Sequence, residues 1–409
     1  MTAIKQPITT SKPRFDFANP AWINAVSKIL NMAKDRKTFF GANGATLQTS
    51  VNVDTATTPS WTNIYTFPSA KGATVTGIVE LANGEAMVVT TESGQANNLS
   101  HVYLSSGWSV NMATATWSEK LVTIGGAITP AYCLYDWSNA KDGTVLVSES
   151  GAQTSGGAGN VANDVARARR VWRSKDFGTT WTLIFDIVEY GASQGVPYGA
   201  SLHMHGVAYD QDWGRIWLTY GDGSGDGDII AGNGYAQVVY SDNDGVTWQK
   251  MALPKLWSGT DALQFISVVV LNNSVIFTHD LSHPLTPLAF PKVGYRKLGE
   301  PIPGPTYPSA VGGIPRKATS DARVPTFFAG TEFVTQTGTM RWCVAATEDD
   351  GFTWSGVYGE IPLQTPALGH TGFEQVLGPT INGKVVATGR LYVNNDNTKT
   401  TMVADLVQT

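Results

Sequence analysis

The stretch Ser174-Lys-Asp-Phe-Gly-Thr-Thr-Trp181 decides the fold of this chain. It has the composition of a tight turn, in which Asp176 can accept hydrogen bonds from neighbouring backbone amides and Gly178 can adopt a positive φ angle. Thr180 would begin the next strand, and Trp181 supplies an apolar ring that can be buried beneath the turn. We therefore expect this octamer to fasten two consecutive β-strands.

The octamer recurs at 241–248 as Ser-Asp-Asn-Asp-Gly-Val-Thr-Trp and at 347–354 as Thr-Glu-Asp-Asp-Gly-Phe-Thr-Trp. The repeated positions are a hydroxyl residue, a side-chain acceptor, a glycine, a threonine and a tryptophan. They are Ser174, Asp176, Gly178, Thr180 and Trp181; Ser241, Asn243, Gly245, Thr247 and Trp248; and Thr347, Asp349, Gly351, Thr353 and Trp354. Degenerate copies end at Trp61 and Trp117, and one copy is missing between 248 and 354. A period of about 50 to 65 residues indicates a propeller.

The octamers resemble the Asp-box, also called the bacterial neuraminidase repeat, with the pattern Ser/Thr-x-Asp-x-Gly-x-Thr-Trp. The resemblance implies a sialidase-like β-propeller, in which each repeat lies between the third and fourth strands of a blade, on the rim away from the central pocket. It implies architecture and not activity, because sialidases, other glycosidases and non-enzymatic binding and virion proteins all carry the repeat.

The composition also favours strands, since the chain has 43 glycines, 10% aromatic residues and only 15% charged residues. We expect an all-β, six-bladed propeller over 41–409, with five blades near 73–124, 128–187, 202–254, 262–304 and 310–362. The sixth blade would be shared, because pairing a strand from 45–67 with the C-terminal strands would remove open sheet edges.

Residues 1–40 are expected to form an arm followed by one amphipathic α-helix. Asn19-Pro20 is a helix-start signal, and Trp22, Val26 and Leu30 fall at helical spacing after it. This segment would either pack on the propeller or attach the chain to a partner.

Charge and hydropathy exclude some functions. The net charge of −5 argues against a general nucleic-acid-binding protein, which should carry a basic patch. The sequence lacks both a long apolar run and the apolar core of a signal peptide, so we expect synthesis in a host cytoplasm without membrane insertion. Cys133 and Cys343 are expected to be separate buried thiols.

Candidate ligand-binding residues gather near the start of the expected third blade. His203 and His205 would project to one face of a strand, where they could contact a ligand or instead be buried between blades with polar partners. Further axial candidates are Tyr220, Asp222, Glu149, His279 and Asp280. The acidic loop with Asp222, Asp226 and Asp228 offers oxygen ligands for Ca²⁺, but it lacks EF-hand spacing, so we expect no cofactor.

Hydrolysis is one of three functions that the sequence leaves open. The Arg-Ile-Pro motif of sialidases is absent before the first octamer, although Arg215 and other arginines remain for a carboxylate-binding triad. Another glycoside hydrolase, such as a polysaccharide depolymerase, would need two carboxylates across a sugar, which Glu149, Asp222, Asp280 or Glu374 could supply.

The favoured function comes from a second resemblance. The run 203–222, His-x-His-Gly…Tyr-Asp…Arg-Ile-Trp…Gly-Asp, resembles Asp-box proteins encoded among phage and prophage tail genes. This resemblance implies a virion protein of the phage tail that binds a host-surface glycan and docks on other tail proteins through its N-terminal segment, as a monomer or a homo-oligomer. The third alternative is a purely structural ring element of the virion.

Overall fold

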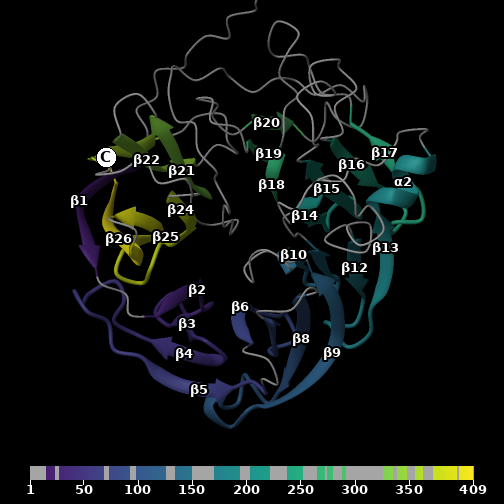
Figure 1. Ribbon diagram of the computed structural model, residues 1–409, viewed down its shortest axis with the longest axis horizontal. Helices are drawn as coiled ribbons and strands as arrows, with labels where there is room; N and C mark the ends of the chain where they lie inside the picture. The colour runs from purple at the N-terminus through teal and green to yellow at the C-terminus, as the bar shows by residue number, and fades with distance from the viewer. Residues whose placement is uncertain are drawn as a thin grey trace, which may run out of the picture. The chain divides into compact units, whose positions relative to one another are not determined.

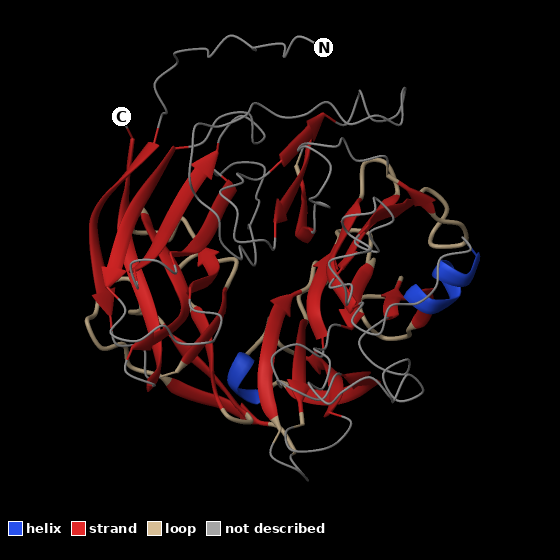
Figure 2. Ribbon diagram, turned by 45° about the horizontal axis from the view of Figure 1, so that its top comes forward, coloured by secondary structure: helices blue, strands red, loops and turns tan. Residues whose placement is uncertain are grey.

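A computed structural model describes most of the strands of this chain. The described residues are 15–23, 27–68, 73–92, 98–125, 134–149, 170–193, 203–221, 237–251, 265–271, 274–279, 288–291, 326–334, 339–347, 355–362, 372–393 and 396–408. They fall into two compact units, 25–270 and 1–24 with 271–409. Strands make up nearly all of the described secondary structure (Figure 2).

The larger unit contains four antiparallel sheets, each built from four consecutive strands, with the first strand innermost and the fourth outermost (Figure 1). The first two sheets are β2 (Lys28–Met32), β3 (Phe39–Asn43), β4 (Thr46–Ser50) and β5 (Thr62–Thr66), then β6 (Thr74–Glu80), β7 (Ala86–Thr91), β8 (Asn98–Ser106) and β9 (Thr116–Gly125). The next two are β10 (Leu134–Asn139), β11 (Val145–Glu149), β12 (Arg170–Ser174) and β13 (Thr182–Asp186), then β14 (His203–Asp210), β15 (Arg215–Gly221), β16 (Gln237–Ser241) and β17 (Gln249–Lys250). A 3₁₀ helix, η1 (Met112–Thr114), precedes β9, the α-helix α2 (Ile187–Ser193) follows β13, and β18 (Phe265–Val270) is the last strand of this unit.

The smaller unit contains the two ends of the chain in one sheet. Its strands follow the order β1 (Phe15–Ile23), β26 (Asp396–Gln408), β25 (Lys384–Val393) and β24 (Gly372–Leu377). A three-stranded sheet joins β21 (Thr326–Val334), β22 (Thr339–Thr347) and β23 (Ser355–Pro362), and β19 (Ser274–His279) pairs with β20 (Leu288–Pro291).

The all-β propeller prediction is confirmed, but the count of six blades is wrong, because the structure supports five blades. The described strands form seven sheets, of which five have four strands and two have three. The expected shared blade is in fact two separate sheets. Residues 45–67 do not pair with the C-terminal strands, because β4 and β5 complete a sheet with β2 and β3, and β1 supplies the fourth strand beside β26.

This miscount has one source, the predicted N-terminal α-helix. Residues 15–23 and 28–32 are strands instead, so two strands were missing from the expected total. Asn19 has a φ of 51°, and the β1–β26 register shifts between Ala18 and Ala21. Pro20 therefore lies within an irregularity of an edge strand, where its missing N–H costs no ladder hydrogen bond.

A repeat that the sequence does not display is present in five strands, namely the first strands of four sheets and β24. Each of these strands carries one extra residue relative to its partner, as in a β-bulge, at its second or third residue. The extra residues are Leu30 in β2, Thr76 in β6, Tyr135 in β10, His205 in β14 and Glu374 in β24. A bulge changes the direction of side chains and increases local twist, so these five strands share one local geometry.

The core lies between neighbouring sheets. Between β10–β13 and β14–β17, for example, buried Leu146, Phe185, Met204, Ile216 and Val239 pack together. The inner strand β14 is likewise buried along most of its described length. No helix among the described residues is long and apolar enough to cross a membrane.

Candidate functional site

The strand order gives each sheet two different ends. Because consecutive strands alternate in direction, the first and third connections of a sheet lie at one end and the second lies at the other. The octamers 174–181 and 241–248 are third connections, so we name this the octamer end. The second connections, 150–169 and 222–236, leave from the opposite end, which we name the long-connection end.

The octamer 174–181 folds as a turn held by Asp176. Asp176 Oδ1 accepts hydrogen bonds from Thr180 N at 2.8 Å and Ser174 Oγ at 2.7 Å, and Oδ2 accepts one from Thr180 Oγ1 at 2.7 Å. Gly178 has a φ of 86°, and its carbonyl accepts a hydrogen bond from Trp181 Nε1 at 2.9 Å. Backbone and side chains therefore close the turn together.

The octamer 241–248 has the same geometry with an amide in place of the carboxylate. Asn243 Oδ1 accepts from Thr247 N at 2.9 Å, while Asn243 Nδ2 donates to Thr247 Oγ1 at 2.9 Å. Trp248 Nε1 donates to Gly245 O and to Ile184 O in β13 of the preceding sheet, both at 3.1 Å. This tryptophan thus ties two neighbouring sheets. In the third copy, Thr347 ends β22, and Asp349, Gly351, Thr353 and Trp354 lie outside the described residues.

The degenerate copy before Trp61 is a longer version of the same turn. Asn52 Oδ1 accepts hydrogen bonds from Ser50 Oγ at 2.8 Å and from Ser60 N at 3.1 Å. These are the partners that Asp176 has in Ser174 and Thr180, with extra residues inserted between them. In the sequence, this turn is marked by Ser50-Val-Asn52 and, after seven further residues, by Ser60-Trp61. A search for an octamer of fixed length misses this pattern.

Further contacts link the octamer ends of sheets β10–β13 and β14–β17. Lys175 Nζ donates to Asp244 Oδ2 at 2.5 Å, and Arg173 also contacts Asp244. The turn between β10 and β11 contacts the turn between β14 and β15, since Lys141 N donates to Gln211 Oε1 at 3.1 Å. The octamer end is therefore cross-linked from sheet to sheet.

Arg215 belongs to this cross-linked end and not to a substrate-binding arginine triad. Its Nε and Nη2 donate to the two carboxylate oxygens of Asp242 at 2.6 and 2.8 Å. The guanidinium also lies over the rings of Trp213, Trp217 and Tyr240, at 5.5, 5.1 and 4.2 Å from their centroids. With its side chain 6% exposed, Arg215 is fully used in holding the β14–β15 turn to the octamer.

At the long-connection end, the structure places Glu149 and Tyr220 in the interior. Glu149 is the last residue of β11, is 0% exposed, and accepts a hydrogen bond from Trp172 Nε1 at 2.9 Å through Oε1. Tyr220 is 3% exposed and packs on Phe185. Burial raises the pKa of Tyr220, so its phenol stays neutral. Both side chains are therefore buried at this end of the sheets.

The histidine pair has a different geometry from the one expected. His205 is the extra residue of the β14 bulge and is 3% exposed, and the next amide, Gly206 N, donates to Thr219 Oγ1 at 2.8 Å. The strict alternation that would put His203 and His205 on one face is interrupted there.

The remaining candidates fall outside what the structure describes. Asp222, Asp226, Asp228 and Asp280 lie outside the described residues, and the side chains of His203 and His279 are not described. The described residues contain no group of three or more His, Cys, Asp or Glu side chains that could hold a metal ion.

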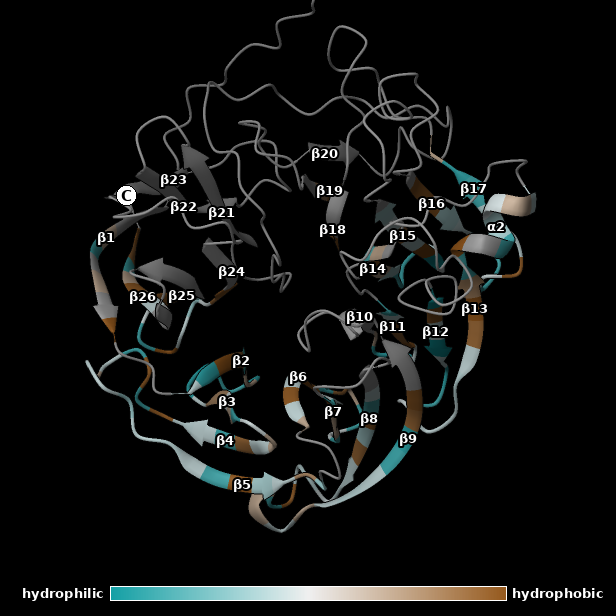
Figure 3. Cartoon of the chain, in the orientation of Figure 1, coloured by the Kyte–Doolittle hydropathy of each residue, from teal (hydrophilic) through white to brown (hydrophobic). Residues whose placement is uncertain are grey.

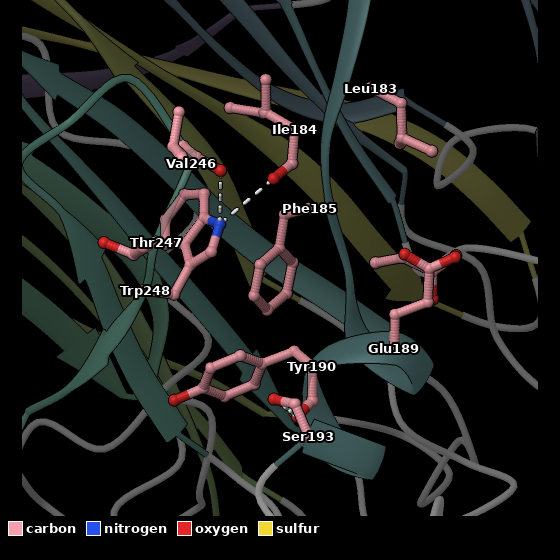
Figure 4. Close-up of a pocket in the computed structure, with 11 residues that line it drawn as sticks. Leu183, Ile184, Phe185, Glu189, Tyr190, Ser193, Val246, Thr247 and Trp248 are labelled. Atoms are coloured by element: carbon pink, nitrogen blue, oxygen red, sulfur yellow. Dashed lines mark hydrogen bonds between the residues drawn. The ribbon is translucent and has the colours of Figure 1, made fainter.

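A cavity that sequence reasoning missed lies on the outer side of these sheets (Figure 4). It has a volume of about 360 Å³. Its walls come from three elements, β13, α2 and the octamer turn: Leu183, Ile184, Phe185 and Asp186; Glu189, Tyr190 and Ser193; and Gly245, Val246, Thr247 and Trp248. Burial raises the pKa of Tyr190, so this residue also stays neutral. The sequence signal was the apolar run Leu-Ile-Phe in an outermost strand, followed by a short helix.

Comparisons with known proteins show no sequence relative. No protein-family model matches the chain, and no curated protein matches it. Among solved structures, the α-L-arabinanase of Penicillium chrysogenum complexed with arabinobiose is 12% identical, with a TM-score of 0.40, over 96% of this chain and 93% of that one. The GH93 α-L-arabinofuranosidase of Fusarium graminearum is 13% identical, with a TM-score of 0.41, over 99% and 96%. The polysaccharide lyase Uly1 is 12% identical, with a TM-score of 0.44, over 99% and 94%. At these identities and TM-scores, the likeness carries no argument about activity or substrate.

Proposed function

We propose that this chain is a carbohydrate-binding β-propeller that contacts its glycan with the long-connection end. The difference between the two ends of sheets β10–β13 and β14–β17 supports this proposal best. Short turns cross-linked by Trp248, Lys175 and Arg215 occupy the octamer end. The long connections, which in most folds carry binding residues, leave from the opposite end.

The composition of the long connections fits a polar, uncharged ligand. Residues 150–169 and 222–236 are rich in Gly, Ser and Asn, and Ser and Asn side chains can hydrogen-bond with sugar hydroxyls. We propose further that the glycan belongs to a bacterial surface and that the chain is a phage-tail protein, which rests on the resemblance of 203–222 to tail-associated proteins. Docking on other tail proteins is then assigned to the residues before Phe15, because the following residues are strands of the propeller.

Glycoside hydrolysis is the second candidate, and the position of Glu149 favours it. This carboxylate ends β11 at the long-connection end, and Asp222 directly follows the last residue of β15 at the same end. Two carboxylates about 5 to 9.5 Å apart across a sugar are what a glycosidase needs. Trp172 would hold the Glu149 carboxylate in place through its 2.9 Å hydrogen bond.

The test is incubation of the full chain with a panel of bacterial surface polysaccharides and sialylated glycans, with binding and sugar release measured in the same samples. Binding without release supports the binding function. It should weaken when Asn160 and Asn163 in the 150–169 connection are both changed to Ala, whereas Val110→Ser, at the exposed octamer end, serves as the matched control.

Release of sugar would replace the binding function with hydrolysis. Glu149→Gln should then abolish release while it preserves binding, since glutamine keeps an acceptor for Trp172. Neither binding nor release with any glycan would overturn both candidates and favour the structural virion role.

A further inference from the structure

The outer cavity has the size of a site for one small ring. Ligand pockets in proteins span about 300 to 1,000 Å³, and this one, at about 360 Å³, lies near the lower limit. It is formed wholly within the larger unit, by β13 and α2 on one side and residues 245–248 on the other. It lies along β13, the outermost strand of its sheet.

Three aromatic side chains from three different elements bound the cavity. The Phe185 ring lies 4.9 Å from Trp248 in an edge-to-face arrangement and 5.3 Å from Tyr190, measured between ring centroids (Figure 4). Trp248 Nε1 is already bonded to Ile184 O and Gly245 O, so the indole offers the cavity carbon surface only. Such a wall suits the C–H face of a ligand that also has polar edges.

The helix α2 also brings polar groups to the cavity. Glu189 is exposed, and its carboxylate can accept hydrogen bonds from two neighbouring hydroxyls. Ser193 Oγ donates to Tyr190 O at 2.7 Å and so belongs to the helix. Aromatic side chains beside an exposed carboxylate match a pyranose ring, which has an apolar face and hydroxyls around its edge.

The charges of the cavity favour a neutral ligand over a cation. Asp186, with its side chain 2% exposed, is paired with Arg170, whose Nε lies 3.5 Å from Asp186 Oδ2. The floor therefore carries no net charge, and Glu189 is the single carboxylate at the mouth.

The surface around the mouth is unusually apolar for an outermost strand. Leu183 is 39% exposed and Val246 is 79% exposed, one on each side of the cavity. Figure 3 shows β13 largely in the brown of apolar residues, whereas β5, the outermost strand of another sheet, is mostly pale or teal. Exposed apolar side chains that flank a concave site commonly mark a contact surface.

We propose that this cavity is a second carbohydrate site, one that binds a single neutral pyranose residue through Phe185, Tyr190, Trp248 and the Glu189 carboxylate. It is separate from the glycan contact proposed for the long-connection end and does not depend on it. Its weak affinity for one ring would add avidity when a polysaccharide contacts both sites.

The experiment uses the full chain and methyl glycosides of glucose, galactose, mannose and N-acetylglucosamine as probes, with saturation-transfer NMR to measure binding. At least one methyl glycoside should bind, and Val246→Trp, which fills the mouth from an exposed position, should weaken that binding about tenfold or more. The matched control is Val110→Trp, which places the same ring at a residue that is 88% exposed and does not line the cavity. Glu189→Gln, at another exposed position, should weaken binding without changing the melting temperature.

Equal binding to wild type and Val246→Trp would overturn the proposal, because the sugar would then bind elsewhere. Lack of binding by all four glycosides, or binding of tetramethylammonium in their place, would overturn it as well. Polysaccharide binding that survives Val246→Trp leaves the function proposed for the long-connection end intact, so failure of either proposal can be recognised separately.

Discussion

At the scale of single residues, the two described octamers form a natural matched pair. Asp176 and Asn243 occupy the same position and accept the same backbone hydrogen bond, from Thr180 N and from Thr247 N. Only Asp176 can titrate. Partial burial by itself disfavours its charge, but hydrogen bonds from Thr180 and Ser174 outweigh that effect and hold the pKa of Asp176 below its ordinary value.

This difference predicts a pH-dependent stability that depends on one residue. Because the pKa of Asp176 is depressed in the folded state, its carboxylate contributes its full stabilisation at pH values above the unfolded-state pKa of about 3.9. This stabilisation is lost as the pH falls through the folded-state pKa. Asp176→Asn should cost about 1 kcal/mol in the free energy of unfolding, equally at about pH 7 and pH 5, and less at about pH 3. Urea unfolding at the three pH values measures it. As the control, Asn243→Asp should acquire the same dependence, and a cost that stays constant down to about pH 3 would contradict the assignment.

The octamer glycines make a second matched pair. Gly178 and Gly245 have φ angles of 86° and 83°, so alanine is strained at both, by about 1 to 2 kcal/mol. A Cβ at Gly178 would meet its nearest neighbour at 3.6 Å, whereas one at Gly245 would lie 2.8 Å from Ile184 Cβ. Gly245→Ala should therefore destabilise the chain by about 1 to 3 kcal/mol more than Gly178→Ala. Thermal unfolding of both variants measures the difference. Equal losses of stability would contradict the prediction and would show that β13 shifts to make room for the new Cβ.

At the scale of elements, the sequence predicts what depends on local chemistry. The octamer turns were predictable because their hydrogen bonds join residues within eight positions, as Asp176 and Thr180 do. Three sheets, β6–β9, β10–β13 and β14–β17, start and end near their expected bounds for the same reason, since strands and turns alternate locally. The strands β1 and β2 were mistaken for a helix, because Trp22, Val26 and Leu30 do fall at helical spacing. Pairing with β26, far along the sequence, overrides that local pattern.

The strand β1 should be essential for covering an edge. Phe15–Ile23 pairs along β26, so deletion of residues 1–23 would expose the backbone donors and acceptors of a thirteen-residue strand. We expect a lower melting temperature and soluble oligomers, detected by calorimetry and size-exclusion chromatography. Asn19→Gly is the control, because it removes the exposed hydrogen bond from Asn19 Nδ2 to Asp405 Oδ2 at 2.9 Å while glycine tolerates the φ of 51°. A deleted chain that melts like the wild type as a monomer would contradict this role of β1.

At the scale of the whole molecule, the candidate site was less predictable than the fold. Sequence alone placed His205, Tyr220 and Glu149 near strand ends, but it could not show that packing between sheets buries all three. The bulge at His205 was also invisible, because a bulge depends on the register with β15. The outer cavity joins residues 183–193 to residues 245–248, and only the side-by-side arrangement of two sheets brings them together.

The pairing of the chain ends gives a last prediction about the whole molecule. Phe15 is the register partner of Gln408, so a short glycine-serine linker can join these two residues directly. A circular permutant that is opened between Ser109 and Val110, where Val110 is 88% exposed, would begin near β9 and end with β8. In that chain β8 and β9 would close one sheet from opposite ends of the sequence, as β1 and β26 do in the wild type. We therefore expect the permutant to unfold cooperatively, with a melting temperature a few degrees below that of the wild type.

A second permutant, opened between Val102 and Tyr103 inside β8, is the matched control and should not fold, because the cut divides a strand that pairs on both sides. Circular dichroism and calorimetry of the two permutants decide the question. If both fold equally well, pairing of the terminal strands is not what closes the chain. If neither permutant folds, the order in which the strands are connected is itself required for folding. Strand pairing alone would then not be enough to close the sheets.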